Sequence, residues 1–278
     1  MIDERCSMRF RNLLAAAALA MLVAAATVFA FGGGNDPMPA LAKAGREPVS
    51  VTVLNYHKVD SMHISLSVLP SDFAWQMQYL EDHGFHPITP DELYDSLEGR
   101  GDLPEKPVLI TFDDGYADNY KNAYPILKKH NFKATIFVVT GFMGKRKGYL
   151  TWDQCREMEK NGISIQAHTV DHRSMTDLTD DEIRSEIVDS KKQAEDELGH
   201  PVEYMAYPTG ACNLHIAQLV KEAGYKAAFT IRYGNADPES NVYAIERVPV
   251  FHTANTNRDF IERITYTPLF ERFGWKKS

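Results

Sequence analysis

Two pairs of side chains in the sequence have the types and spacing to hold and use a metal ion. Asp113 and Asp114 lie side by side in TFDDG, and His168 and His172 lie four residues apart in HTVDH. Four residues of extended strand span about 13 Å, whereas a nitrogen ligand lies about 2 Å from its zinc ion. The histidines can therefore share an ion only if the chain curls directly after His168.

One carboxylate and two imidazoles would give an ion three protein ligands and leave a fourth position open for water. The second carboxylate could then act as a general base. Zinc is the expected ion, but cobalt, nickel and iron accept the same ligands, and iron oxygenases use this ligand set too. Taken singly, DDG is common in turns and two histidines four residues apart are common on surfaces. Their joint placement at two predicted strand ends favours a catalytic metal site.

The elements that must position these residues alternate along the chain. Short apolar strand patterns, among them PVLITF and ISIQAH, are separated by helical patterns. The clearest helix is predicted after Thr179, which forms a capping box with Glu182. Six or seven such units predict an α/β fold with a closed or nearly closed barrel of parallel strands, and an open doubly wound sheet is the alternative. In both folds the carboxyl ends of the strands gather at one edge, where the two acids and two histidines fall.

The N-terminal part of the chain has the pattern of an export segment. Residues 13–31 form an uncharged, mostly apolar run that follows three arginines. Such a run can span a bilayer with its basic flank in the cytoplasm, so residues 1–31 are predicted to be a cytoplasmic stub with a transmembrane anchor, or a signal peptide. Residues 32–48 are predicted to be a flexible linker and residues 49–278 a single domain. This domain is expected on the extracytoplasmic face of the cell envelope, membrane-anchored or secreted.

The composition limits the partners of this exported domain. The net charge is -8, and the first 42 residues hold equal numbers of acidic and basic side chains, so the exported part keeps the whole excess of negative charge. It has no basic field to neutralise phosphates, which argues against nucleic acid as a partner. Cys155 and Cys212 are predicted to be buried free thiols rather than a disulfide.

TFDDG followed by HTVDH resembles the motif pair of the polysaccharide deacetylases of carbohydrate esterase family 4, the NodB homology domain, and the resemblance covers nearly all of residues 49–265. It implies a distorted (β/α) barrel that removes acetyl groups from N-acetylglucosamine residues of a polysaccharide. It also implies that Asp113 is the catalytic base and that Asp114, His168 and His172 bind a divalent metal.

The opening LNYHKV is similar to that of a permuted subgroup, which includes the poly-N-acetylglucosamine deacetylases of the PgaB and IcaB type. This similarity implies that His57, rather than His252 after the last predicted strand, is the general acid. It favours poly-β-1,6-N-acetylglucosamine as the substrate, with peptidoglycan or chitooligosaccharides as alternatives. An inactive glycan-binding module is a further alternative. The domain is expected to be a monomer.

The chain departs from the family pattern at the third motif, AYPTG, where Ala206 stands in place of an arginine. That arginine normally steadies the base, so Arg247 is considered as its replacement. The backbone N–H of Thr209 is predicted to stabilise an oxyanion, a role that needs no particular side chain. Trp152 is considered as a residue on which a sugar could stack, although core packing is the favoured interpretation.

Overall fold

The structure, a computed structural model, describes residues 50–272 and the side chains of residues 50–266. The expected anchor or signal peptide in residues 1–31 and the linker in residues 32–48 lie outside the described residues. Between residues 50 and 272, no helix combines the length and the apolar character that crossing a bilayer requires.

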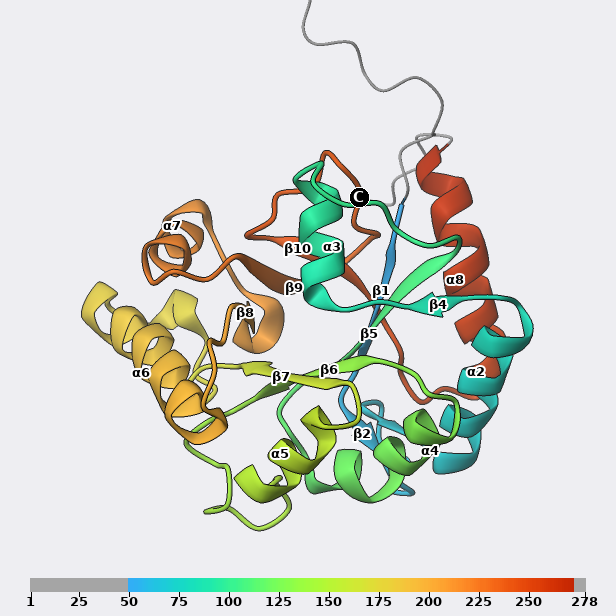
Figure 1. The fold of residues 1–278 in the computed structure, drawn as a ribbon, viewed down its shortest axis with the longest axis horizontal. Coiled ribbons are helices and arrows are strands. Elements are labelled where there is room, and N and C mark those ends of the chain that lie inside the picture. Colours follow the sequence, from blue (N-terminus) through green and yellow to red (C-terminus); the bar gives the residue numbers. More distant parts are fainter. Residues whose placement is uncertain (1–49, 273–278) are drawn as a thin grey trace, which may run out of the picture. The chain divides into compact units, whose positions relative to one another are not determined.

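Parallel strands close into a barrel, as the strand-helix alternation predicts (Figure 1). Each strand pairs with the next one around the barrel, in the order β1 (Thr52–Tyr56), β10 (Ile245–Pro249), β9 (Ala227–Tyr233), β8 (Tyr204–Ala206), β7 (Ile163–Ala167), β6 (Ala134–Val138) and β5 (Pro107–Phe112). The barrel closes because β5 pairs again with β1, with Leu54 opposite Ile110. The short strand β4 (His86–Pro87) lies beside the beginning of β5. All carboxyl ends of the barrel strands consequently meet at one rim.

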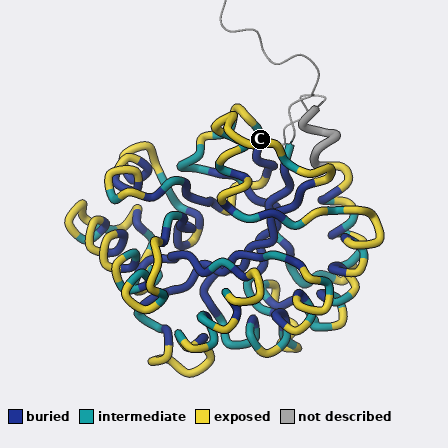
Figure 2. The backbone as a smooth tube through the Cα atoms, viewed as in Figure 1, coloured by how far each residue is buried: buried dark blue, intermediate teal, exposed yellow. Residues whose placement is uncertain are grey.

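Helices surround the barrel, and the strands lie buried inside them (Figures 1 and 2). They are α2 (Pro70–Asp82), α3 (Pro90–Leu97), α4 (Tyr124–Lys129), α5 (Trp152–Glu159), α6 (Asp180–Leu198), α7 (Leu214–Glu222) and α8 (Thr256–Arg272). Shorter elements are the strand pair β2 (Lys58–Val59) and β3 (Ser67–Val68), the π-helix η1 (Asn119–Ala123) and the 3-10 helices η2 (Met175–Asp177) and η3 (Pro208–Gly210).

Helix boundaries follow the sequence signals in some places and depart from them in others. The capping box of Thr179 and Glu182 is confirmed at the start of α6. Ser71 has a side chain typical of an N-cap but lies inside α2, because Pro70 already occupies the first turn, where its fixed φ angle suits a helix start. Cys155 and Cys212 are both free thiols, as predicted, although Cys212 is only partly buried.

An aromatic cluster fixes the carboxyl ends of β1 and β5 beneath the rim. The rings of Tyr56, Phe73 and Phe112 have centroids 5.2 to 5.7 Å apart, and all three side chains are buried. Phe73 comes from α2, so this helix braces the two strands where they close the barrel. The backbone that leads into Asp113 starts from this packed cluster.

We expect Phe73→Ala to lower the free energy of unfolding by about 3–5 kcal/mol, because it leaves a cavity between α2 and the two strands. Gln78→Ala on the exposed face of the same helix is the control, with an expected change within about 0.5 kcal/mol. Urea unfolding of both variants measures the difference. Equal losses in the two variants would contradict a packing role for this ring.

Candidate active site

Both acidic residues of the first motif follow β5 directly, at the rim of the barrel. The backbone N–H of Asp113 still donates to the carbonyl of Tyr56 at 2.9 Å, which extends the pairing of β5 with β1 by one residue. Asp114 and Gly115 then take the left-handed conformation, with φ angles of 74° and 73°. A side chain on Gly115 would also lie 3.0 Å from Val138 Cγ1. Glycine therefore permits the sharp turn that brings the Asp114 side chain to the rim beside Asp113.

The second motif has the curl that a shared ion requires. His168 follows β7, and both Thr169 and His172 have a φ angle of 63°. The backbone N–H of His172 donates to the Thr169 hydroxyl at 3.2 Å. These features turn the chain back on itself, and the two imidazole rings lie with centroids 4.8 Å apart.

Asp114, His168 and His172 form one group of ligand atoms. Asp114 Oδ1 lies 3.5 Å from His168 Nε2 and 3.1 Å from His172 Nε2, and the three ligand atoms lie within 4.8 Å of one another. His168 is fully buried, whereas 32% of the His172 side chain is exposed, so the group is open on one side. In the described part of the chain, no other set of three His, Cys, Asp or Glu residues is close enough to hold a metal.

The chemistry of these donors fits a divalent cation. His168 Nδ1 donates to the carbonyl of Ala206 at 2.8 Å, so the proton sits on that nitrogen and Nε2 presents its lone pair to the group. Burial alone raises the pKa of Asp114, but the adjacent imidazoles of His168 and His172 outweigh burial and hold the pKa far below its ordinary value. The carboxylate is therefore ionised, as a metal ligand must be.

Asp113 lies outside this group and is paired with Arg247 of β10. The guanidinium donates to both carboxylate oxygens, at 2.8 Å and 2.6 Å, and Asn55 of β1 donates to Oδ2 at 3.0 Å. Burial raises the pKa of Asp113, but the charge of Arg247 and the nearby His168 outweigh it, so the pKa lies below its ordinary value. Two charged groups are thus held in the interior by a bidentate contact.

Arg247 is itself fixed in place. Its Nε donates to the carbonyl of Thr230 at 2.7 Å, and Nη1 also donates to the hydroxyl of Thr111 at 3.1 Å. The side chain is fully buried. The structure thus brings Asp113 together with the arginine that the sequence could name only as a candidate. Asn55 was not predicted to be a site residue. Its one signal in the sequence is an amide within the mostly apolar strand pattern VTVLNY.

His57 follows β1 and lies close enough to Asp113 and Asp114 for their charges to affect its pKa. Burial lowers the pKa of His57 below its ordinary value, although the charges of Asp113 and Asp114 oppose this shift. His252, the competing histidine, follows β10 and packs its ring against His63, with centroids 5.3 Å apart. The charges of Asp113 and Asp114 thus act on His57, whereas His252 packs against His63.

Thr209 and Trp152 belong to two different connections between barrel strands. Thr209 belongs to η3, directly after β8, and has a φ angle of 57°. The next residue, Gly210, must be glycine, because a Cβ there would lie 2.2 Å from Ile231 Cγ1. Trp152 is the first residue of α5, and its half-buried ring packs against two of the hydrophobic clusters of the core.

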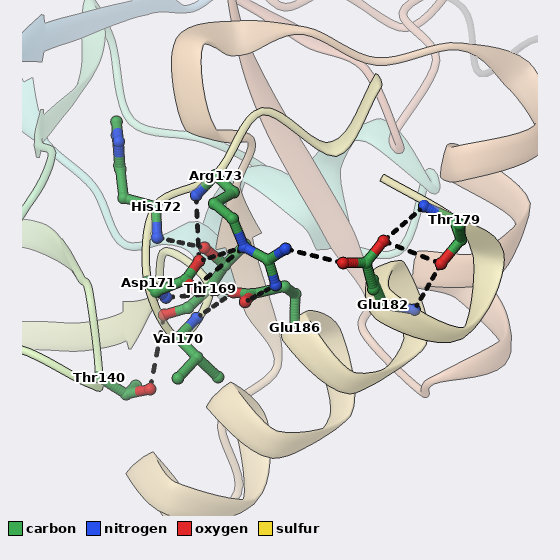
Figure 3. A network of polar contacts seen from close by, with 9 residues as sticks. All are labelled: Thr140, Thr169, Val170, Asp171, His172, Arg173, Thr179, Glu182 and Glu186. Atoms are coloured by element: carbon green, nitrogen blue, oxygen red, sulfur yellow. Dashed lines mark hydrogen bonds and ion pairs between the residues drawn. The ribbon is translucent and has the colours of Figure 1, made fainter. Parts of the chain in front are cut away.

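The loop that carries His172 is held by a buried carboxylate of α6, which the sequence analysis did not identify (Figure 3). Glu186 Oε2 accepts hydrogen bonds from the backbone N–H groups of Val170 and Asp171, at 2.8 and 3.1 Å. Glu186 Oε1 accepts from Arg173 at 3.2 Å, and Arg173 also pairs with Glu182 at 3.0 Å. The signal for Glu186 in the sequence is its position beside Ile187, on the apolar stripe of the helix. A charged side chain that is buried there needs a hydrogen-bond partner.

The chain is similar to proteins of one family. The sequence profile of the polysaccharide deacetylase family matches residues 100–228. YxkH of Bacillus subtilis, which is assigned to the polysaccharide deacetylases, is 39% identical over 204 residues, or 73% of this chain and 72% of the relative. The poly-beta-1,6-N-acetyl-D-glucosamine N-deacetylase of Staphylococcus aureus is 28% identical over 228 residues, or 72% of this chain and 78% of the relative.

A solved structure shares the fold. The deacetylase PplD of Streptococcus pyogenes, in complex with acetate, superposes with a TM-score of 0.74 at 31% sequence identity. The match covers 78% of this chain and 99% of that chain. The similarity therefore extends over nearly all of the other chain.

We expect Glu186→Ala to weaken the binding of an added divalent metal by about 10–100-fold, because the amides that shape the His172 loop lose their acceptor. Arg173→Ala is the matched control, since it removes the partner of Glu186 Oε1 without touching those amides. Competition with a chromophoric chelator measures the affinity of both variants. Equal losses would show that the charge around Arg173, rather than the amide contacts of Glu186, supports the site.

We expect Arg247→Met to lower the free energy of unfolding by about 3–5 kcal/mol at neutral pH, because it leaves the carboxylate of Asp113 buried without a counter-charge. Adding Asp113→Asn should restore part of the loss. The low pKa of Asp113 in the folded wild type means that its ion pair stabilises the protein above the ordinary pKa and less as the pH falls.

Urea unfolding with a metal chelator, repeated from neutral to acidic pH, measures both effects. The difference between wild type and Arg247→Met should narrow as the pH falls, because without Arg247 burial raises the pKa of Asp113, so the folded variant takes up the proton at a higher pH than the folded wild type. A difference that stays constant between neutral pH and about pH 3 would contradict the ion pair as its source.

Proposed function

The chain belongs to the polysaccharide deacetylase family, and from this premise we propose that it is a metal-dependent N-deacetylase that releases acetate from N-acetylglucosamine residues of an extracytoplasmic polysaccharide. The observation that carries the proposal is the convergence of Asp114, His168 and His172 beside the paired carboxylate of Asp113. The relative named poly-beta-1,6-N-acetyl-D-glucosamine N-deacetylase supports that polymer as the favoured substrate.

Asp114, His168 and His172 would hold the metal, with zinc favoured and cobalt, nickel or iron as alternatives. A divalent ion bound there supplies a Lewis acid for the acetyl carbonyl and makes a nearby water more acidic. Asp113 takes the proton from the attacking water. Its ionised state at neutral pH makes it able to do so, and Arg247 with Asn55 fixes the direction of its oxygens.

The amide bond then breaks between the carbonyl carbon and the sugar nitrogen. The backbone N–H of Thr209 stabilises the negative charge that develops on the carbonyl oxygen. His57 donates a proton to the departing nitrogen, since an amide nitrogen leaves poorly without one. The products are acetate and a free glucosamine amine. Trp152 is proposed only as a secondary sugar contact, because its ring already packs against the core.

The proposed setting follows from the substrate and from residues 1–31. A polymer outside the cytoplasm requires the domain to act on the extracytoplasmic face of the cell envelope. We propose that residues 1–31 either anchor it to the membrane or direct its secretion, and that the domain acts as a monomer. Its partner is the polysaccharide, and its negative net charge argues against nucleic acid.

We expect the zinc-loaded protein to release acetate fastest from β-1,6-linked N-acetylglucosamine oligomers, more slowly from β-1,4-linked oligomers and peptidoglycan. Asp113→Ala should lower the rate by about a hundredfold or more, because it removes the general base. Enzymatic detection of acetate measures the rates, and removal of the metal with a chelator should abolish them. If metal-bound protein releases no acetate from any of these substrates, the glycan-binding alternative replaces the enzyme.

A further inference from the structure

Asp118 and Asn119, which follow the TFDDG motif in the chain, contact the segment that carries His57. Asp118 Oδ2 pairs with the Lys58 ammonium at 2.6 Å, and Asp118 Oδ1 accepts the backbone N–H of Val59 at 2.8 Å. Asn119 Nδ2 donates to the backbone carbonyl of His57 at 2.9 Å. Two adjacent side chains therefore hold three consecutive residues, 57 to 59.

These contacts are well shielded from water. Asn119 is 1% exposed, and the side chains of Lys58 and Asp118 are 15% and 11% exposed. Interactions in such surroundings are screened less than those on the surface. Asn122, three residues after Asn119, adds a hydrogen bond to the carbonyl of Val59 at 2.7 Å. Both asparagines belong to the π-helix η1, an element that often marks a functional position.

The position of His57 depends on such backbone contacts. β1 ends at Tyr56, so His57 is the first residue beyond the strand. Its buried Nδ1 has no hydrogen-bond partner among the described residues, so that nitrogen does not tie the ring in place. The backbone on either side of the ring must therefore determine where the imidazole lies. The main-chain pairing of Tyr56 with Asp113 fixes one side, and Asp118 and Asn119 fix the other.

We propose that Asp118 and Asn119 are positioning residues for the general acid: they hold the backbone of residues 57–59 so that His57 faces the sugar nitrogen. This inference rests on the proposed function. It means that residues 113–119 carry the base, one metal ligand and the support of the acid. The separation of base and acid is then set by the pairing of Asp113 with Tyr56 and by the contacts of Asp118 and Asn119.

This role predicts a selective defect. Protonation of the leaving group is needed for an amide, but an aryl acetate releases a phenolate that leaves without it. Substitution of a residue that acts only through His57 should thus lower the rate of acetamide hydrolysis and change the rate of aryl ester hydrolysis little. Damage to the metal site, to Asp113 or to the fold would slow both reactions.

The experiment compares kcat/KM for N-acetylglucosamine oligomers and for 4-nitrophenyl acetate, with the full-length, zinc-loaded protein. His57→Ala sets the reference, with an expected loss of about a hundredfold or more on the amide and little on the ester. Asn119→Ser and Asp118→Ala should lose about 10–100-fold on the amide and far less on the ester. Tyr120→Phe, in the same π-helix but bonded to Glu157 on the surface, is the control and should match the wild type on both substrates.

Asp118→Asn tests the role without removing the whole side chain. It keeps an oxygen for the N–H of Val59 but loses the charge that pairs with Lys58, so its loss on the amide should be smaller than that of Asp118→Ala. Parallel losses on amide and ester in the Asp118 and Asn119 variants, or no loss on the amide, would overturn the positioning role while the proposed function stands. If His57→Ala itself slows both reactions equally, His57 is not the acid and the inference fails with it.

Discussion

The buried ion pair between Asp113 and Arg247 constrains the rest of the site. A carboxylate that is 2% exposed is stable in its charged form only with a counter-charge and hydrogen bonds, and Arg247 supplies both. The partners lie 134 residues apart in the chain and meet because β10 and β5 both pair with β1. Closure of the barrel therefore also brings Arg247 beside Asp113 and balances the charge in the candidate site.

The group of Asp114, His168 and His172 depends on a second, separate set of contacts. Its two histidines come from a loop with two left-handed residues, and such a loop needs support from outside. Glu186 provides this support by accepting two backbone N–H groups, and the carbonyl of Ala206 fixes the ring of His168. One carboxylate of α6 and one carbonyl of β8 thus shape a site to which neither contributes a ligand.

The sequence predicted the parts of this arrangement that are local. Strand periodicity predicted parallel strands in a barrel or an open sheet, and the two short motifs predicted that one carboxylate and two imidazoles meet at the strand ends. The resemblance to the deacetylase family then implied that Asp114 is this carboxylate. The sequence named Arg247 only as a candidate partner of Asp113, because their contact depends on the register between β10, β1 and β5. Nor did it identify Glu186, since a lone acid on an apolar stripe indicates burial but not its partner. The π-helix at Asn119 and the short strand β4 are too short to show a hydrophobic periodicity from which they could be predicted.

The absent arginine of the third motif shows what the site physically requires. Asp113 needs a fixed positive charge beside it, and this requirement specifies a point in space rather than a position in the sequence. Here β8 presents Ala206, whose carbonyl serves His168, while Arg247 reaches the carboxylate from β10 with its guanidinium 5.7 Å from the ring of Phe137. Because the strands of a closed barrel converge on one rim, several strands can deliver a long side chain to the same point. A missing motif residue is therefore weak evidence against activity until the charge around the base has been examined in three dimensions.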